Sequence, residues 1–306
     1  MFGNNSLTPY YQPSGRAPAA GTVLFLVGGV AVAWILGIVY TYVLGFVPSV
    51  YVSVLGTFGF GVGIGLVCRW AVKVGKLRSP SGVTTFAVLV TVVGLWLHWA
   101  FFCAFIFNRF DPKDCPLGEG YAIFLQSPAA IGAAMSILLE EGHFSVGSSS
   151  DNITGVVLAI VWIIEAAIIF AAVVILARAQ AKVPFSEACD CWAHDEKLPG
   201  ELPFVVDVPG MKNALEYGDI SRLMVNAGEH APAAANCAQI TLHAVEEDPD
   251  CRFLSLVNVT VTVDKKGKEQ RKNQSVVQYL RLSAEKYQTL RTAFGTQHQP
   301  DGQAAG

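Results

Sequence analysis

Hydrophobic residues fall in four long, continuous runs in the first part of the chain. The runs cover residues 22–43, 49–67, 82–107 and 155–177. Each is long enough to cross a bilayer as a helix, which takes about 20 apolar residues. Because the apolar residues are continuous rather than alternating, a transmembrane β-barrel is excluded. The pattern predicts an all-α, four-span membrane domain over residues 22–177, preceded by a disordered cytosolic tail at residues 1–21.

Basic residues beside these runs predict the orientation. They are Arg69, Lys73, Lys76 and Arg78 between the second and third runs, and Arg178 and Lys182 after the fourth. The long loop 108–154 is acidic by comparison. Since basic loops stay on the cytosolic side, we expect both termini in the cytosol and this loop outside, in the cell (inner) membrane. Tyr40, Tyr42 and Tyr51 would then form an aromatic belt at the outer boundary.

The outer loop contains a second kind of apolar segment, "YAIFLQSPAAIGAAMSILLEEG" (121–142). Ser127 and Pro128 break it into two pieces, each too short to span. We therefore expect an interfacial helix or one that dips back among the spans. Cys103 and Cys115 lie near this loop, and the sequence leaves open whether they pair or stay as thiols.

Small residues recur at steps of three and four within the runs, which is typical of helix-packing faces in lipid. These helix-packing residues are Gly29, Ala33 and Gly37 in the first run, Gly59 and Gly63 in the second, and Thr84, Ala87, Thr91 and Gly94 in the third. The second run, with "GTFGFGVGIG", would lie at the centre of the bundle. No strand precedes that stretch and no Lys-Ser/Thr follows it, so it is not a phosphate-binding loop.

His98 is the only histidine, and Glu165 the only carboxylate, inside the four runs. Counted from the outer ends of their helices, both would lie about 14–15 Å deep, near the midplane. We therefore expect them to form an intramembrane polar pair, with Trp162 one turn from Glu165. The pair would relay protons or bind a cation, fasten two helices together, or leave Glu165 protonated and idle. The sequence leaves these three roles open.

Most charged residues follow residue 177, so the remainder of the chain is predicted to be soluble. After a linker at 178–210, a helical pattern interrupted at Gly218 precedes strand patterns at 239–245, 253–263 and 274–283. Ser283 would cap a closing helix. The fold class is therefore a membrane all-α four-helix bundle followed by a small cytosolic α+β domain, an antiparallel sheet with helices, over 211–295. Residues 296–306 form a polar tail expected to be disordered.

A basic turn joins the last two predicted strands. It contains Lys265, Lys266, Lys268, Arg271 and Lys272. Such a turn is most often a solvated surface feature. The alternative is contact with anionic head groups of the inner leaflet, at about 1 kcal/mol per charge.

A cluster of potential metal ligands follows the fourth run, in "PFSEACDCWAHDE" (184–196). Cys189, Cys191 and His194 could supply three ligands, and a structural zinc site needs four. A fourth would come from Cys237, His243 or Cys251, which show no paired spacing. Free thiols are the usual state in a cytosolic domain, so the sequence offers a metal site only as one reading. No other cofactor is expected.

This segment also resembles one in a loose set of uncharacterised bacterial four-span membrane proteins. There it often reads Pro-Phe-Cys-x-x-Cys-x-x-Trp. Here Pro184, Phe185, Cys189 and Trp192 match, whereas Ser186 replaces the first cysteine. The resemblance covers the membrane domain and this segment. It implies a multi-pass membrane protein and no particular activity, and the missing thiol argues against a metal knuckle of that type.

The sequence contains no recognisable hydrolase, metalloprotease or nucleotide-binding motif. A net charge of -3 gives no electrostatic case for nucleic-acid binding. We expect a non-catalytic membrane anchor, sensor or assembly partner that presents the cytosolic domain, bound to the lipid bilayer and to a protein partner or a second copy. The alternative is a small proton- or cation-coupled transporter or channel using Glu165 and His98. A membrane enzyme using His143 and Glu140 is a third reading.

Overall fold

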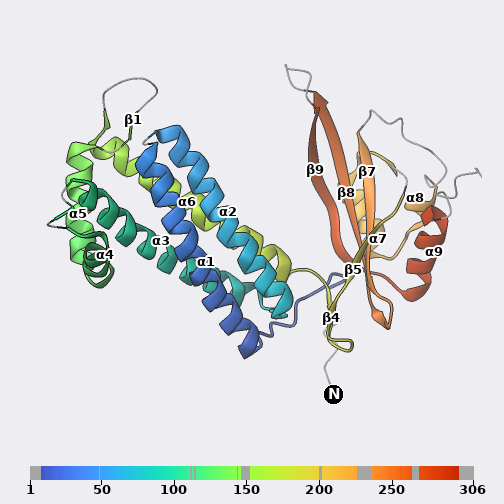
Figure 1. Ribbon diagram of the computed structural model, residues 1–306. Coiled ribbons are helices and arrows are strands. Elements are labelled where there is room, and N and C mark those ends of the chain that lie inside the picture. Colours follow the sequence, from blue (N-terminus) through green and yellow to red (C-terminus); the bar gives the residue numbers. More distant parts are fainter. Residues whose placement is uncertain are drawn as a thin grey trace, which may run out of the picture. The chain divides into compact units, whose positions relative to one another are not determined.

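The structure, a computed structural model, divides the chain into two compact units (Figure 1). Pro13–Lys182 form the membrane unit, and Met1–Gln12 with Val183–Gly306 form the sheet domain. The described residues are 8–47, 49–110, 112–113, 115–142, 144–145, 152–199, 202–225, 236–263 and 269–295. The predicted fold class is confirmed: apolar helices come first, and an antiparallel sheet with helices follows.

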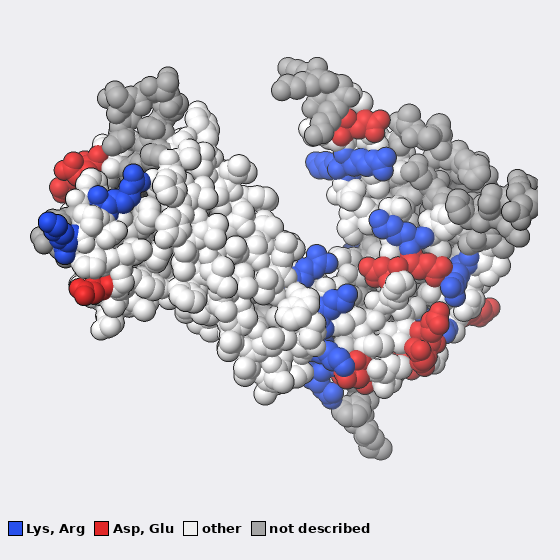
Figure 2. Space-filling view, viewed as in Figure 1, with Lys and Arg blue, Asp and Glu red and all other residues white. Residues whose placement is uncertain are grey.

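Four long apolar helices form the membrane unit. They are α1 (Ala19–Phe46), α2 (Val50–Val74), α3 (Pro80–Phe110) and α6 (Gly155–Ala181). Each helix extends past the apolar run that predicted it at one end or at both. In Figure 2 the visible face of the bundle is uncharged between its two ends, where Lys, Arg, Asp and Glu appear. This band is what a lipid bilayer requires.

Close contacts give the direction of each helix. Gly29 faces Val90 and Gly37 faces His98, so α1 and α3 run parallel. Likewise Gly61 lies against Ile169 and Gly65 against Leu176, so α2 and α6 run parallel, opposite to the first two. We call the end where α3 finishes and α6 starts the loop end. The opposite end, where α1 starts and α6 finishes, is the tether end.

Two shorter helices, α4 (Leu117–Gln126) and α5 (Pro128–Glu141), meet at a bend of 111°. Gly120 faces Ala104, near the loop end of α3. Further along α4, the Leu125 carbonyl accepts a hydrogen bond from Trp96 Nε1 at 3.3 Å. Trp96 lies about 20 Å from the end of α3. Leu125, near the end of α4, therefore lies level with the interior of α3 rather than with its loop end.

The predicted packing residues fall on helix interfaces with one exception. A Cβ on Gly94 would lie 2.8 Å from the Ala33 Cβ, and one on Gly29 would lie 2.9 Å from Val90. Gly63 packs on Leu36 of α1 in the same way. Gly59 has no atom within 4 Å of the Cβ position, so its assignment to a packing face was wrong.

Along α3, the predicted small face is largely buried. Ala87, Thr91 and Gly94 are buried, while Thr84 is half-buried with its hydroxyl donating to the Pro80 carbonyl. The central helix was also misplaced in the prediction. Because α4 and α5 cover α3, it is α3 rather than α2 that has the most buried span.

The sheet domain contains a five-stranded antiparallel sheet of order β5-β7-β8-β9, with β6 also paired to β7. Its strands are β5 (His194–Lys197), β6 (Leu202–Pro203), β7 (Cys237–Val245), β8 (Asp248–Val263) and β9 (Glu269–Arg281). The short pairs β1 (Phe144–Ser145) with β2 (Asn152–Ile153), and β3 (Phe185–Ser186) with β4 (Cys191–Trp192), lie outside this sheet.

Helices cover one face of the sheet (Figure 1). They are α7 (Val208–Glu216), α8 (Ser221–Met224) and α9 (Ala284–Gly295). Leu254 and Leu256 of β8 share a core with Leu223 and Leu290 of the helices, and all four are fully buried. Ser283 caps α9 as predicted, its hydroxyl accepting from the Lys286 N–H at 3.3 Å.

The N-terminal segment is part of this sheet domain, contrary to the predicted disordered tail. Tyr10 forms an antiparallel bridge with Leu280, the Tyr11 N–H donates to the Tyr279 carbonyl at 2.9 Å, and the Arg281 N–H donates to the Pro9 carbonyl at 2.8 Å. We call residues 9–12 the strap. It adds a short strand to β9, and the signal was missed because polar and proline-rich residues usually indicate a loop.

The predicted linker at 178–210 was also wrong in part. Helix α6 continues to Ala181, and β3 to β6 follow within this range, so the segment belongs largely to the sheet domain. Of the predicted basic turn, Arg271 and Lys272 are exposed on β9. Lys265, Lys266, Lys268 and the tail 296–306 lie outside the described residues.

Candidate functional site

Buried polar side chains gather in one layer of the bundle. The Tyr40 hydroxyl of α1 lies 2.7 Å from Thr57 Oγ1 and 3.2 Å from Ser53 Oγ, both on α2. It also donates to the Ser53 carbonyl at 3.3 Å. All three residues are nearly or fully buried. Tyr40 is therefore not part of the predicted aromatic belt, because its phenol points inward to α2.

Glu165 joins the same layer from α6. Its carboxylate accepts a hydrogen bond from the Ser53 hydroxyl, and the residue is 8% exposed. One turn earlier, Trp162 packs edge-on against Trp99 of α3, with ring centroids 4.9 Å apart. The prediction that Glu165 faces the bundle interior is therefore confirmed by its burial and its partner.

His98 belongs to the layer but does not pair directly with Glu165. Its Nδ1 lies 3.2 Å from the Gly37 carbonyl and 3.3 Å from Thr41 Oγ1, both on α1. The imidazole stacks on the Tyr40 ring at 4.8 Å. The predicted direct contact was wrong because α1 stands beside α3 and supplies the nearer partners. Tyr40 links the two residues instead, with its ring on His98 and its hydroxyl on Ser53.

The layer lies closer to the loop end than the predicted midplane. Ser53 is three residues into α2, and Tyr40 is six residues before the end of α1. At about 1.5 Å per residue, the layer lies within about 9 Å of the end of the α1–α2 hairpin. The estimate from sequence used α3 and α6, whose longer ends continue past that hairpin.

Toward the tether end, apolar and small side chains fill the bundle. Ile64, Val90 and Cys68 are fully buried there. The hydroxyl of Thr91 bonds within its own helix, to the Ala87 carbonyl at 2.8 Å. Within the described bundle, the polar layer is therefore not continued toward the tether end by bonded polar side chains.

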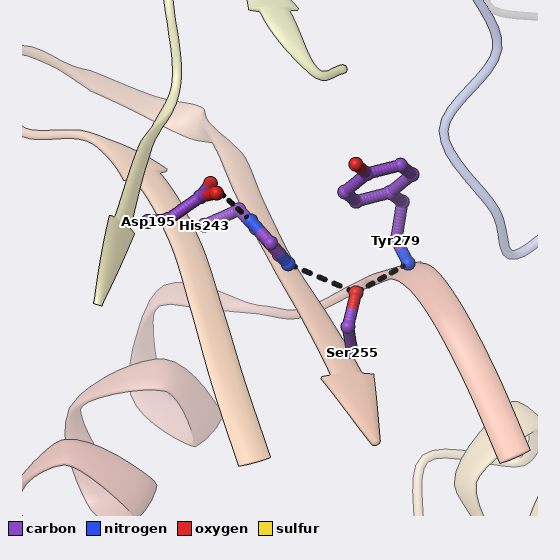
Figure 3. A network of polar contacts seen from close by, with 4 residues as sticks. All are labelled: Asp195, His243, Ser255 and Tyr279. Carbon is purple, nitrogen blue, oxygen red and sulfur yellow. Dashed lines mark hydrogen bonds and ion pairs between the residues drawn. The ribbon is translucent and has the colours of Figure 1, made fainter. Parts of the chain in front are cut away.

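A second polar network lies in the sheet domain, on the sheet face away from the helices (Figure 3). Asp195 of β5 lies opposite His243 of β7, and its carboxylate is 2.6 Å from His243 Nδ1. His243 Nε2 is 2.9 Å from the Ser255 hydroxyl of β8. In the neutral imidazole, Asp195 accepts from Nδ1–H, which leaves Nε2 to accept from the Ser255 hydroxyl.

A bulge in β9 explains why this network exists. Tyr279 has φ of 57°, in the left-handed region, and pairing between β8 and β9 shifts register there. Its N–H donates to Ser255 Oγ at 3.1 Å, while its carbonyl accepts from Tyr11 of the strap. Ser255 thus satisfies a main-chain group that the bulge removes from the ladder. The network connects the strap to β5, which is the first strand of the five-stranded sheet to follow α6 in the chain.

The order Asp–His–Ser is also that of a nucleophilic triad. In this sheet, however, Ser255 is 7% exposed and its oxygen already accepts the bulge N–H. Attack on a substrate would require the loss of that bond. The geometry is that of a structural network that fixes the β9 bulge.

The predicted ligands Cys189, Cys191 and His194 do not converge. Cys189 and Cys191 pack with Cys251 on the network face, and His194 pairs with Ala244 one residue before Asp195. Strand alternation therefore turns His194 to the opposite face. Among the described residues, no three His, Cys, Asp or Glu side chains form a metal-binding group. Cys189 is a free thiol.

The structure also places the other polar residues and cysteines that the sequence analysis singled out. Ser186, at the position of the missing cysteine, donates to Asp248 at 2.5 Å. Burial raises the pKa of the Cys251 thiol to about 12, with Asp248 adding to the effect. Cys103 and Cys115 are both free thiols. Glu140 is exposed near the end of α5, and His143 lies outside the described residues.

Sequence reasoning missed Tyr40, Ser53, Asp195, Ser255 and Tyr279. In the membrane unit a signal existed, because Tyr40, Ser53 and Thr57 are hydroxyls on the two helices of a tight hairpin. In the sheet domain none of the missed residues forms a local motif, since they come from three strands far apart in the chain.

No family model, no curated protein and no solved structure matches this chain.

Proposed function

We propose that this protein is a non-catalytic membrane anchor that holds its sheet domain at the cytosolic surface of the cell membrane for assembly with a protein partner. The main support for this proposal is the strap. Residues 9–12 belong to the same compact unit as the strands after α6. The start of α1 and the finish of α6, both at the tether end, therefore lead into one domain through short connections. Such double tethering suits a domain that must stay at the membrane in a defined position.

Two further features support the orientation and the assembly role. Arg69, Lys73 and Arg178 lie toward the tether end, which favours a cytosolic location for that end. In the sheet, β9 is the last strand, and among the described residues the strap pairs with it around Leu280. The rest of its outer edge offers main-chain groups for strand addition by a partner or a second copy.

Site-specific photo-crosslinking tests the proposal. A photoreactive residue at Gln274, exposed on β9, should give one discrete adduct in intact membranes. The same residue at Lys212, exposed on α7, is the matched control and should give none. Equal diffuse labelling from both positions, or none from Gln274, would contradict the assembly role.

The alternative is a small proton- or cation-coupled transporter or channel using Glu165 and His98. The buried polar layer favours it, because ionisable groups inside a bundle often mark an ion path. The apolar packing toward the tether end weighs against it. Ion or proton flux in proteoliposomes, lost in Glu165→Gln and His98→Ala, would establish the transporter and displace the anchor proposal.

A further inference from the structure

Among the described residues, hydroxyls and no Lys or Arg bond the Glu165 carboxylate. Lys and Arg occur only near the ends of the four long helices. His98 directs Nδ1 to Gly37 and Thr41 and lies on the far side of the Tyr40 phenol from Ser53. An ionised carboxylate in a low-dielectric interior is costly unless it is paired. A proton or a small cation must therefore balance its charge.

The polar layer contains more oxygen atoms than a protonated Glu165 would need as hydrogen-bond partners. The hydroxyls of Tyr40, Ser53 and Thr57 and the main-chain carbonyl of Ser53 lie in one connected group with Glu165. Carboxylate, hydroxyl and carbonyl oxygens are the ligands of hard cations. Oxygens sharing an ion at about 2.4 Å stand about 3.4 Å apart. The Tyr40 hydroxyl is already 3.2 Å from Ser53 Oγ and 3.3 Å from the Ser53 carbonyl. Its 2.7 Å contact with Thr57 Oγ1 and the close contact between Ser53 and Glu165 must lengthen when the ion enters.

We propose that Glu165, Ser53, Thr57 and Tyr40 form a binding site for one monovalent cation of the size of Na⁺. A single carboxylate neutralises a single positive charge, whereas a divalent ion would leave a net charge buried. Close packing of the layer selects Na⁺ or Li⁺ over K⁺. The inference concerns binding alone and stands apart from the anchor role.

The ion enters from the loop end. Ser53 lies in the first turn of α2 and Tyr40 near the end of α1, so the α1–α2 turn is the shortest route to water. In the other direction, Phe60 and Ile64 of α2 are buried among apolar neighbours. The proposed site is therefore reached from the loop end alone, and the apolar packing below it does not form a channel.

Thermal unfolding of the full-length protein in detergent tests the site. Na⁺ is titrated against choline at constant ionic strength, with intrinsic tryptophan fluorescence, to which Trp99 and Trp162 contribute, as the readout. The melting temperature should rise saturably with Na⁺, less with K⁺. At 100 times Kd, the ion should raise the folding equilibrium constant about 100-fold.

Variants separate the site from general salt effects. Glu165→Gln and Thr57→Val should abolish the Na⁺ response. Thr91→Ala, which removes a buried hydroxyl bonded only within α3, should keep it. Identical wild-type curves in Na⁺ and choline would show that a proton balances the charge and would overturn the site. An Na⁺ response in Thr57→Val equal to that of the wild type would also overturn the site. This test holds even if Glu165→Gln does not fold.

Discussion

The Ser53 hydroxyl donates a hydrogen bond to the Glu165 carboxylate and thereby joins α2 to α6 inside the apolar bundle. Replacing Glu165 by Ala removes the acceptor and leaves buried hydroxyls without it. We expect a loss of about 1–3 kcal/mol in stability. Glu165→Gln keeps a carbonyl acceptor and should lose less. Unfolding in detergent measures both, and equal stability of all three proteins would contradict a fastening role.

Close packing between α1 and α3 predicts a contrast between two glycines. A Cβ at Gly94 would lie 2.8 Å from the Ala33 Cβ, whereas Gly59 has open space. Gly94→Ala should therefore destabilise the bundle by about 1–3 kcal/mol. Gly59→Ala should be neutral or stabilising by up to about 1 kcal/mol, because alanine favours helix. The melting temperatures of the two variants, measured under the same conditions, test this contrast. A lower value for Gly59→Ala than for Gly94→Ala would contradict it.

The sheet network predicts that its members contribute unequally. Ser255→Ala leaves the buried Tyr279 N–H and His243 Nε2 unpaired, so we expect a loss of about 1–3 kcal/mol. The Asp195 side chain is 63% exposed, and water can replace it. Asp195→Ala should therefore cost less than about 1 kcal/mol. A larger effect of Asp195→Ala than of Ser255→Ala, measured by chemical unfolding, would contradict this account of the bulge.

The strap predicts a pH dependence. Tyr10 donates to Glu216 at 2.6 Å, and burial, with this acceptor next, raises the pKa of the phenol. A group whose folded pKa is raised stabilises the fold below its unfolded pKa, about 10, and loses that contribution as pH rises through the folded pKa. Tyr10→Phe should therefore be less stable than wild type near neutral pH. The difference should shrink above about pH 10.

Hydrogen exchange at Arg281 provides the control for that prediction. Its N–H bonds to Pro9 of the strap, so deletion of residues 8–12 should speed exchange there and leave Leu256, in the centre of the sheet, unchanged. Uniform acceleration would mean that the domain as a whole has loosened.

Cysteine reactivity predicts a ranking at neutral pH. Cys251 is 5% exposed and its pKa is raised to about 12, so almost no thiolate forms. Iodoacetamide should modify the half-buried Cys189 well before Cys251 in the folded protein. Denaturant should remove the difference, and mass spectrometry of the peptides gives both rates.

The sequence predicted elements whose signals are local. Continuous apolar runs gave the spans, and alternation of Val257, Val259 and Val261 with polar neighbours gave β8. What it could not give depends on contacts between distant segments. The depth of Glu165 follows from the short α1–α2 hairpin, which only packing reveals. The strap pairs Tyr10 with Leu280, and no local pattern connects them.

The strap has a consequence for biosynthesis. Its residues leave the ribosome before the four long helices, whereas Tyr279 and Leu280, which bind it, leave after them. All four long helices must be translated, and the chain brought back to its starting side, before this edge can close. Closure of the edge therefore reports that the chain has threaded the bilayer an even number of times. A molecule inserted with one crossing missing would carry an open sheet edge, a feature that protein quality control recognises as unfinished.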